Sequence, residues 1–159
     1  MSLAIRRLEA DTPAAELAAR WRYDAFFADG GDTFESSRAA LLDFLRGQDG
    51  YEIGLIAECG GQPAGLCLFV RAEADANPRP DLTPWLAALY VAPDFRRRGI
   101  GGALVKAIED HARKVGTATL HLYTSEAERF YAGLGWQTRQ RFIQNGESFA
   151  LMVRALSTP

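Results

Sequence analysis

One stretch of this chain constrains its fold more than any other: a strand, a glycine-rich turn and an amphipathic helix follow one another directly. The apolar run WLAALYV, Trp85 to Val91, predicts a buried strand. A helical pattern begins at about Gly101, keeps its apolar residues on one face, and stops at Gly116. The connection between strand and helix holds three consecutive arginines. We therefore expect a long helix that crosses over a sheet.

The other hydrophobic patterns predict a mixture of strands and helices. A strand is expected over residues 3–8, followed by a helix capped by Asp11 or Thr12 and a second helix that stops at Gly47. Residues 51–59 and 63–72 predict an antiparallel hairpin. A strand over 117–124 and a short helix over 125–135 precede a last hairpin, 136–144 with 147–156, which turns at Asn145 and Gly146. This order of elements predicts an α+β fold.

Composition and charge exclude several classes of protein. A chain of 159 residues, 48% of them hydrophobic, suits one domain over residues 1–159. The net charge of −2 argues against a nucleic-acid binder. No apolar run is long enough to span a membrane and no signal peptide is visible, so we expect a cytoplasmic protein without a membrane partner. Cys59 and Cys67 are expected to be buried and reduced, and no Cys/His cluster has metal-ligand spacing, so no metal is expected.

The arginine-glycine stretch is a candidate anion site. A helix that begins near Gly101 leaves backbone N–H groups unpaired in its first turn, where the helix dipole also favours negative charge. Glycines at 99, 101 and 102 let a ligand approach the backbone closely. Arg96, Arg97 and Arg98 add positive charge at the rim, so the stretch suits a pyrophosphate. The alternative is a solvated loop in which the glycines only form a turn.

Three phosphate-binding motifs can be compared by their spacing. A P-loop requires Gly-Lys-Ser/Thr, which is missing, because Gly102 runs into Ala103 and Leu104. A dinucleotide fingerprint fits only in part, since its third glycine position is Leu104. The third pattern is an Arg/Gln-x-x-Gly-x-Gly/Ala turn after a strand that ends in Val-x-Pro. This chain fills every position of it, in the order Val91, Pro93, Arg96, Gly99, Gly101.

These residues resemble a known family. LYVAPDFRRRGIGGALV is similar to the coenzyme-A-binding motif of the GCN5-related N-acetyltransferases (GNAT), and AERFYAGLGW is similar to the family's FY-x-x-LGF motif, with Trp136 replacing phenylalanine. The resemblance implies a mixed, mostly antiparallel sheet of about six to seven strands flanked by about four helices. It also implies a splayed pair of parallel strands that binds acetyl-CoA as co-substrate.

The resemblance assigns roles to individual residues. The pantetheine arm would pair with the strand residues Leu89, Tyr90 and Val91. The pyrophosphate would be bound by the turn and the helix start, which are Arg96, Arg97, Arg98, Gly99, Ile100, Gly101 and Gly102. Thr124 replaces an asparagine that binds coenzyme amides in many relatives. Tyr131 would donate a proton to the leaving thiolate, since a tyrosine keeps its proton at neutral pH. The alternative for Tyr131 is a core aromatic of a short helix.

A general base for the amine cannot be picked out from the sequence. The strand WLAALYV holds no carboxylate. The candidates are loop acids, each of which would otherwise be a solvated surface residue: Asp29, Asp32, Glu35, Glu73, Asp75 and Asp81. His121 could also act as a base, although a histidine in a strand is more often structural, and His111 is expected to pack on its helix.

The resulting hypothesis is an acetyl-CoA-dependent N-acetyltransferase that acts on a primary amine of a small molecule, with a peptide amine as the second choice. Its acceptor pocket would come from residues 21–34, 73–85 and 142–149, whose aromatics and acids suit a cationic amine with an apolar body. The alternative hypothesis is a non-catalytic acyl-CoA-binding or sensor module. The expected assembly is a monomer or a homodimer, since an edge strand could pair with another copy.

Overall fold

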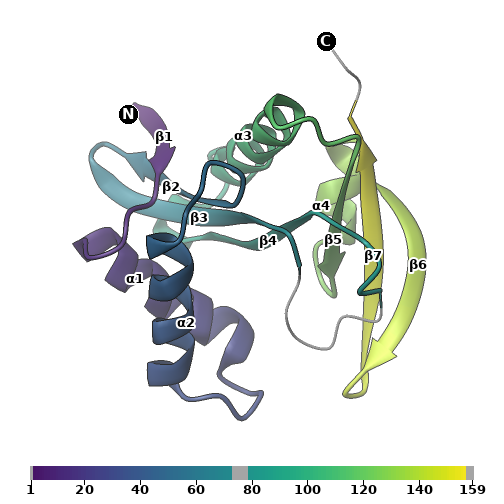
Figure 1. Cartoon of the computed structure of the whole chain (residues 1–159), viewed down its shortest axis with the longest axis horizontal. Coiled ribbons are helices and arrows are strands. Elements are labelled where there is room, and N and C mark those ends of the chain that lie inside the picture. The colour runs from purple at the N-terminus through teal and green to yellow at the C-terminus, as the bar shows by residue number, and fades with distance from the viewer. Residues whose placement is uncertain (1, 73–78, 157–159) are drawn as a thin grey trace. The chain divides into compact units, whose positions relative to one another are not determined.

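The α+β composition predicted from the sequence is confirmed. The structure, a computed structural model, describes residues 2–72 and 79–156 (Figure 1). In chain order the elements are β1 (Leu3–Arg7), α1 (Pro13–Arg22), the π-helical turn η1 (Tyr23–Phe27), α2 (Phe34–Arg46), β2 (Ile53–Cys59), β3 (Gln62–Val70), β4 (Trp85–Val91), the 3-10 turn η2 (Pro93–Phe95), α3 (Ile100–Lys114), β5 (Thr119–Thr124), α4 (Glu128–Gly133), β6 (Gln137–Gln144) and β7 (Glu147–Ala155).

The chain forms two compact units. The first contains Met1–Leu68 and Ala88–Ala107, and the second contains Phe69–Ala87 and Ile108–Pro159. The division falls inside β3, β4 and α3, and each unit is described by itself below. That the whole chain forms one domain stays a prediction.

The strands follow the order β1-β2-β3-β4-β5-β7-β6, seven in the described part of the chain. β1 pairs with β2, β5 with β7, and β6 with β7, all antiparallel. β4 pairs with β5 in parallel, with Trp85 opposite His121. The predicted mixed, mostly antiparallel sheet with one parallel pair is therefore confirmed.

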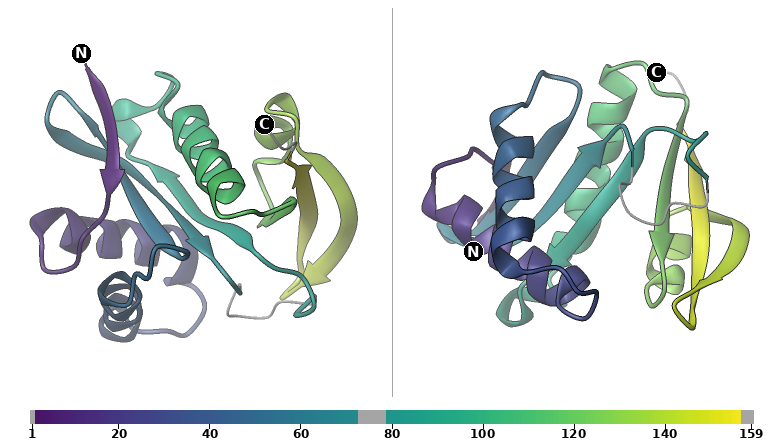
Figure 2. Two further views of the ribbon diagram at one scale, coloured as in Figure 1. Left: turned by 45° about the horizontal axis from the view of Figure 1, so that its top comes forward. Right: turned by 60° about the horizontal axis from the view of Figure 1, so that its bottom comes forward.

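In the first unit, helices lie on both faces of the strands. α1 and α2 lie on one side of β2 and β3, and the first turns of α3 lie on the other (Figure 2). Thr12 caps α1, accepting a hydrogen bond from Ala15 N at 3.1 Å. At its C-terminal end the first helix widens into the π-helical turn η1, closed by a 2.9 Å hydrogen bond from Ala28 N to Tyr23 O.

In the second unit, β5 leads into α4 and then into the β6–β7 hairpin. The hairpin turns at Asn145 (φ 51°) and Gly146 (φ 76°), as the sequence predicts. Leu120 and Leu122 of β5 and Leu151 and Met152 of β7 are fully buried. These four side chains of β5 and β7 therefore belong to the apolar core.

The two cysteines match their prediction. Cys59 and Cys67 are both buried and neither is in a disulfide. Burial raises the pKa of the Cys67 thiol well above its ordinary value. The thiol is therefore held in its neutral, unreactive form.

Candidate functional site

The end of β4 is held by β3 and by an aromatic contact within the first unit. Ala92 N donates to Ala64 O of β3 at 2.8 Å. The ring of Tyr90 lies 5.5 Å from that of Trp21 on α1. Ala88 has φ 56°, in the left-handed region that a non-glycine residue seldom adopts. β4 is therefore not a regular strand along its whole length, and Leu89, Tyr90 and Val91 follow this irregularity half-buried.

Gly65 of β3 supports this strand end from behind. A Cβ at position 65 would lie 2.6 Å from Tyr90 O, 3.2 Å from Leu104 Cδ1 and 3.4 Å from Val91 Cα. Only glycine allows β3, β4 and α3 to approach this closely. Gly65 thus sets the position of the end of β4 relative to the start of α3.

Arg96 closes the turn instead of extending from it. Its Nε donates to Val91 O at 2.8 Å, and its guanidinium lies 5.5 Å from the Tyr90 ring centroid. Arg97 (φ 64°) and Gly99 (φ 79°) both adopt left-handed backbone and bend the chain toward α3. The arginines therefore differ in role: Arg96 stabilises the turn, while Arg97 and Arg98 have exposed side chains.

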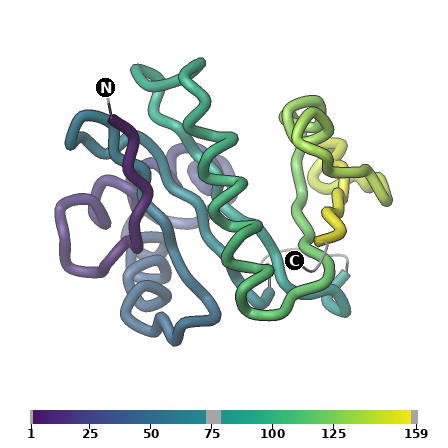
Figure 3. Tube along the Cα trace, turned by 90° about the horizontal axis from the view of Figure 1, so that it is seen from above, coloured from purple at the N-terminus to yellow at the C-terminus, as the bar shows by residue number. Residues whose placement is uncertain are grey.

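The start of α3 presents free backbone donors. The first backbone hydrogen bond at this end of the helix runs from Ala103 N to Gly99 O at 3.0 Å, so the N–H groups of residues 100–102 have no carbonyl partner within the helix. Gly99 has no side chain to cap them, and a Cβ there would meet open space. Figure 3 follows the chain from β4 through this turn into α3. This end of the helix is suited to an anion.

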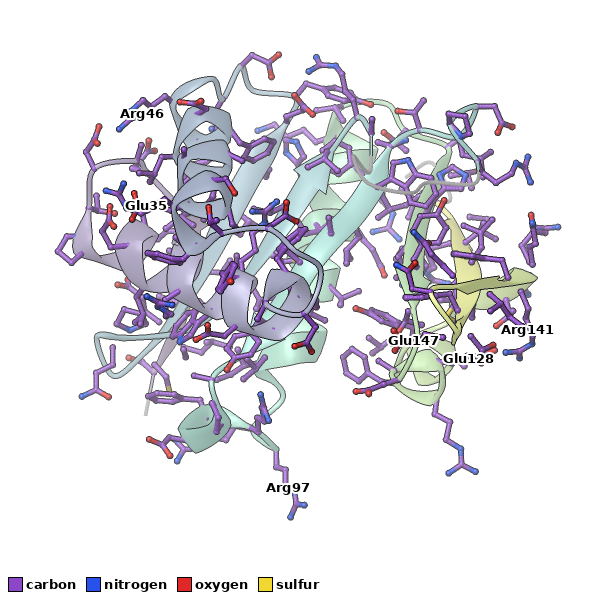
Figure 4. All side chains as sticks on the ribbon, turned by 90° about the horizontal axis from the view of Figure 1, so that it is seen from below. Glu35, Arg46, Arg97, Glu128, Arg141 and Glu147 are labelled. Carbon is purple, nitrogen blue, oxygen red and sulfur yellow. The ribbon has the colours of Figure 1, made fainter. Side chains whose placement is uncertain are left out.

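Two further arginines stand at the rim of this helix start. In the described part of the chain, neither Arg97 nor Arg98 is in an ion pair with a carboxylate. Arg97 extends outward from the turn (Figure 4), and the Arg98 guanidinium lies 5.5 Å from the Phe95 ring centroid. Free N–H groups, an open approach at Gly99 and two guanidinium groups without a carboxylate partner together suit a diphosphate or a similar anion.

In the second unit, Thr124 and Tyr131 lie on either side of the start of α4. Thr124 Oγ1 accepts a hydrogen bond from Ala127 N at 2.9 Å, so its oxygen already serves the turn before the helix. Tyr131 is 7% exposed, and its ring centroid lies 5.1 Å from Phe130 and 5.9 Å from Trp136. The Tyr131 ring is therefore held by packing on two sides.

The candidate bases differ in their surroundings. Asp81 pairs with Arg79, with oxygen-nitrogen distances of 3.0 and 2.8 Å, and the hydrogen bonds from Arg79 hold the pKa of Asp81 below its ordinary value. A carboxylate stabilised in this way is a weak base. Asp29, Asp32 and Glu35 are exposed in the first unit, and Glu73 and Asp75 lie outside the described residues.

His121 has a structural environment. It is 6% exposed, its Nδ1 lies 3.0 Å from Pro84 O, and its ring centroid is 5.3 Å from that of Trp85. Burial lowers the pKa of His121, only partly offset by the contact with the Pro84 carbonyl. His111 packs edge-on against Phe69, with ring centroids 5.0 Å apart, as expected.

The lowered pKa of His121 predicts a pH-dependent stability. The unfolded chain binds the proton near the ordinary value of 6.5, while the folded chain does so only at lower pH. The free energy of unfolding should therefore be constant above that value and fall as the pH drops below it. Urea denaturation at several pH values measures this, and in His121→Asn, whose amide can still donate to Pro84 O, the slope should become shallower. An unchanged slope would assign the pH dependence to other groups.

The structure groups the predicted residues by unit. Leu89, Tyr90, Val91 and residues 96–102 lie together in the first unit, and Thr124 and Tyr131 lie together in the second. Sequence reasoning missed Gly65 in the first unit and Glu109 in the second, and it placed Trp21 in the acceptor segment without its contact with Tyr90. An isolated glycine inside a strand pattern signals a close backbone approach and could have revealed Gly65. Glu109 had no such signal, since its partner Trp136 is far away in the sequence.

Neither a metal cluster nor a membrane-spanning helix occurs among the described residues. No group of three or more His, Cys, Asp or Glu side chains is arranged to hold a metal ion among residues 2–72 and 79–156. Within the same residues, no helix combines the length and the apolar character that crossing a bilayer requires.

Comparison with known proteins identifies the family of the chain. The sequence profile of the acetyltransferase (GNAT) domain matches residues 50–138. That match covers more than half of the chain and includes β4, the turn, α3, β5 and α4. The fold and this site thus define a GNAT domain, and the chain belongs to the GNAT family of acetyltransferases.

Individual relatives are more distant. An uncharacterized N-acetyltransferase of Methanocaldococcus jannaschii is 29% identical over 101 residues, which are 60% of this chain but only 42% of the archaeal protein. A GCN5-related N-acetyltransferase from Ralstonia eutropha is 28% identical with a TM-score of 0.67, covering 90% of this chain and 97% of that one. An aminoglycoside 6'-N-acetyltransferase complexed with coenzyme A shares the fold, with a TM-score of 0.77 at 15% identity and 98% coverage of both chains.

Proposed function

We propose that the protein is an acetyl-CoA-dependent N-acetyltransferase that acetylates a primary amine of a small molecule. The observation that supports this most is the start of α3, where the N–H groups of residues 100–102 are unpaired and Gly99 leaves the approach open. Membership of the GNAT family makes an acetyl-CoA diphosphate the natural ligand of these donors. When bound, acetyl-CoA would supply a thioester acetyl group.

The first unit would hold the coenzyme. The N–H groups of residues 97–102 would donate to the diphosphate, and Arg97 and Arg98 would add charge at the rim. Leu89, Tyr90 and Val91 would pair with the pantetheine arm. The Val91 carbonyl already accepts a hydrogen bond from Arg96 Nε. Arg96 would act on the coenzyme indirectly, by holding the turn.

The chemistry then requires three proton movements. The acceptor ammonium must lose one proton before its nitrogen can attack, and the nitrogen loses a second as the new C–N bond becomes an amide. The departing sulfur gains one proton as the C–S bond breaks. Tyr131 is the proposed donor to the sulfur. An alkyl ammonium has a pKa of about 10.4, so some group or water chain must take up its proton at pH 7. Among the acids considered, Asp81 is the least suited because Arg79 stabilises its charged form.

A small-molecule acceptor is supported by the aromatic side chains near the expected acceptor segments. In the first unit Trp21 contacts Tyr90, and exposed Phe26 lies on η1. In the second unit Phe142 stacks on Phe149. The aminoglycoside acetyltransferase with the same fold acts on a small amine. A peptide amine is the second choice.

The turnover experiment measures free thiol release from acetyl-CoA with a panel of amines and peptides. We expect release only with an acceptor, and most with small primary amines that carry an apolar body. Coenzyme A binding measured by calorimetry without any turnover across the panel would favour the alternative, a non-catalytic acyl-CoA sensor. The paired state of Asp81 is the observation that keeps this alternative in consideration.

The binding experiment isolates the diphosphate contact. We expect acetyl-CoA to bind far more tightly than acetyl-pantetheine, which lacks the diphosphate. The double variant Arg97→Gln/Arg98→Gln should lose about tenfold in affinity for acetyl-CoA and keep its affinity for acetyl-pantetheine. Arg129→Gln, which removes an exposed arginine of α4, is the matched control. Equal affinity for the two thioesters would contradict the proposed role of the helix start.

A further inference from the structure

We propose that Glu109, a buried carboxylate on α3, is a positioning residue for Tyr131 and acts through the indole of Trp136. This inference rests on the proposed role of Tyr131 as proton donor. All three residues belong to the second unit. Neither the motifs nor the family match assigns a role to Glu109.

The helix that carries Tyr131 is too short to fix its own position. α4 has six residues, less than two turns, and isolated helices of this length are unstable in water. Its C-terminal end closes on Tyr131 itself, whose carbonyl accepts from Leu134 N at 2.9 Å and from Trp136 N at 3.1 Å. The orientation of Tyr131 is therefore linked directly to the position of Trp136.

Trp136 is in turn anchored to α3. It is 2% exposed, and its Nε1 donates to Glu109 Oε2 at 3.0 Å. A buried indole N–H needs an acceptor, and here the acceptor is a carboxylate, which makes a stronger hydrogen bond than a neutral oxygen. The motif that this sequence resembles has phenylalanine at this position, and phenylalanine has no N–H to donate. Trp136 and Glu109 thus form a contact that the motif residue could not make.

Two arginines form ion pairs with Glu109. This residue is 6% exposed, and its carboxyl lies 3.7 Å from Arg154 Nε and 4.0 Å from Arg113 Nη2. Arg154 also donates from Nη1 to Gly135 O at 3.2 Å, directly before Trp136 in the chain. A Cβ on Gly135 would lie 2.5 Å from the same Nη1, so this guanidinium packs on the glycine. Glu109 therefore binds the indole of Trp136, and Arg154 binds the carbonyl of Gly135, the residue before it.

A second contact fixes the opposite end of α4. Glu128, in its first turn, accepts hydrogen bonds from Arg141 Nη1 and Nη2 at 2.9 and 2.6 Å, and the two side chains lie side by side (Figure 4). This pair is largely exposed, whereas the Glu109 contact is buried. Solvent screens the exposed pair, so the buried contact should control the position of Tyr131 more strictly.

The test compares Glu109→Ala, Glu109→Gln and Trp136→Phe with the control Asp110→Asn. Asp110 is the next residue of α3, pairs with Arg113 at 3.2 Å, and has an exposed side chain, so its variant removes a charge on α3 without touching Trp136. We expect Glu109→Ala and Trp136→Phe each to lower kcat about tenfold with an unchanged KM for acetyl-CoA, because the donor is displaced while the coenzyme site is intact. Glu109→Gln, whose amide oxygen can accept the indole N–H, should restore most of kcat. Asp110→Asn should match the wild type.

The double variant Glu109→Ala/Trp136→Phe supplies the decisive comparison. If Glu109 acts through the indole, its removal should lower kcat no further once Trp136 is phenylalanine. Additive losses, a raised KM, or no rescue by Glu109→Gln would overturn the proposal. Should Glu109→Ala fail to fold, Trp136→Phe and Glu109→Gln still decide it.

A spectroscopic measurement separates this inference from the proposed function. The chain has three tryptophans, and the indole N–H signal of Trp136 is the one that Trp136→Phe removes from the ¹H-¹⁵N spectrum. Glu109→Ala should shift this signal and the ring signals of Tyr131, and Asp110→Asn should shift neither. If the wild-type protein turned over no amine, the proposed function would fail while these shifts still supported the anchor. Unshifted Tyr131 signals would overturn the anchor whatever the activity.

Discussion

Replacing Tyr131 with phenylalanine should lower kcat for acetyl transfer by about two orders of magnitude, the range expected when a general acid is removed. The KM for acetyl-CoA should change little. The ring, 7% exposed and packed between Phe130 and Trp136, is kept by the substitution, so the fold and α4 should be preserved. Steady-state kinetics with the best amine of the panel gives both parameters.

Tyr123→Phe is the matched control for this experiment. Tyr123 lies on β5 of the same unit, half-buried, with its ring 4.6 Å from Trp85 and 5.0 Å from Phe142. The Tyr123→Phe variant also loses a tyrosine hydroxyl in an aromatic environment. The kcat of this variant should stay within a few-fold of the wild-type value. Equal losses in both variants, or no loss in Tyr131→Phe, would remove Tyr131 from the mechanism and leave it a core aromatic.

Gly65→Ala should reduce both stability and coenzyme affinity. The new Cβ would lie 2.6 Å from Tyr90 O and 3.4 Å from Val91 Cα, both backbone atoms that can only move with β4. Overpacking of this kind destabilises a fold by about 1–3 kcal/mol. Because the displaced strand end leads into the turn before α3, acetyl-CoA affinity should fall by about tenfold or more. Urea denaturation and calorimetry measure the two effects.

Gly30→Ala is the control in the same unit. Its Cβ would meet only Phe27 O, at an ordinary contact distance of 3.6 Å, and Gly30 does not have the left-handed backbone of Gly31. The free energy of unfolding and the coenzyme affinity of this variant should match the wild type. A Gly65→Ala protein with wild-type stability and affinity would show that β4 and α3 can shift without consequence for the site.

Local signals in the sequence were sufficient for the elements and for the coenzyme motif. The hairpin turn at Asn145 and Gly146, the cap at Thr12 and the end of α2 at Gly47 each depend on a few neighbouring residues. The same is true of the glycine turn into α3, because a helix start exposes its N–H groups wherever it forms. These features, and the family resemblance built on them, could be predicted from the sequence.

The tertiary structure decided the role of individual side chains. The sequence grouped Arg96, Arg97 and Arg98 as equivalent charges, but Arg96 bonds to Val91 O because the η2 turn brings them together. Gly65 and Glu109 are ordinary residues of a strand and a helix until distant residues, Tyr90 and Trp136, pack against them. Backbone conformation depends on nearby residues, whereas a side chain's partner depends on which distant segment the fold places beside it.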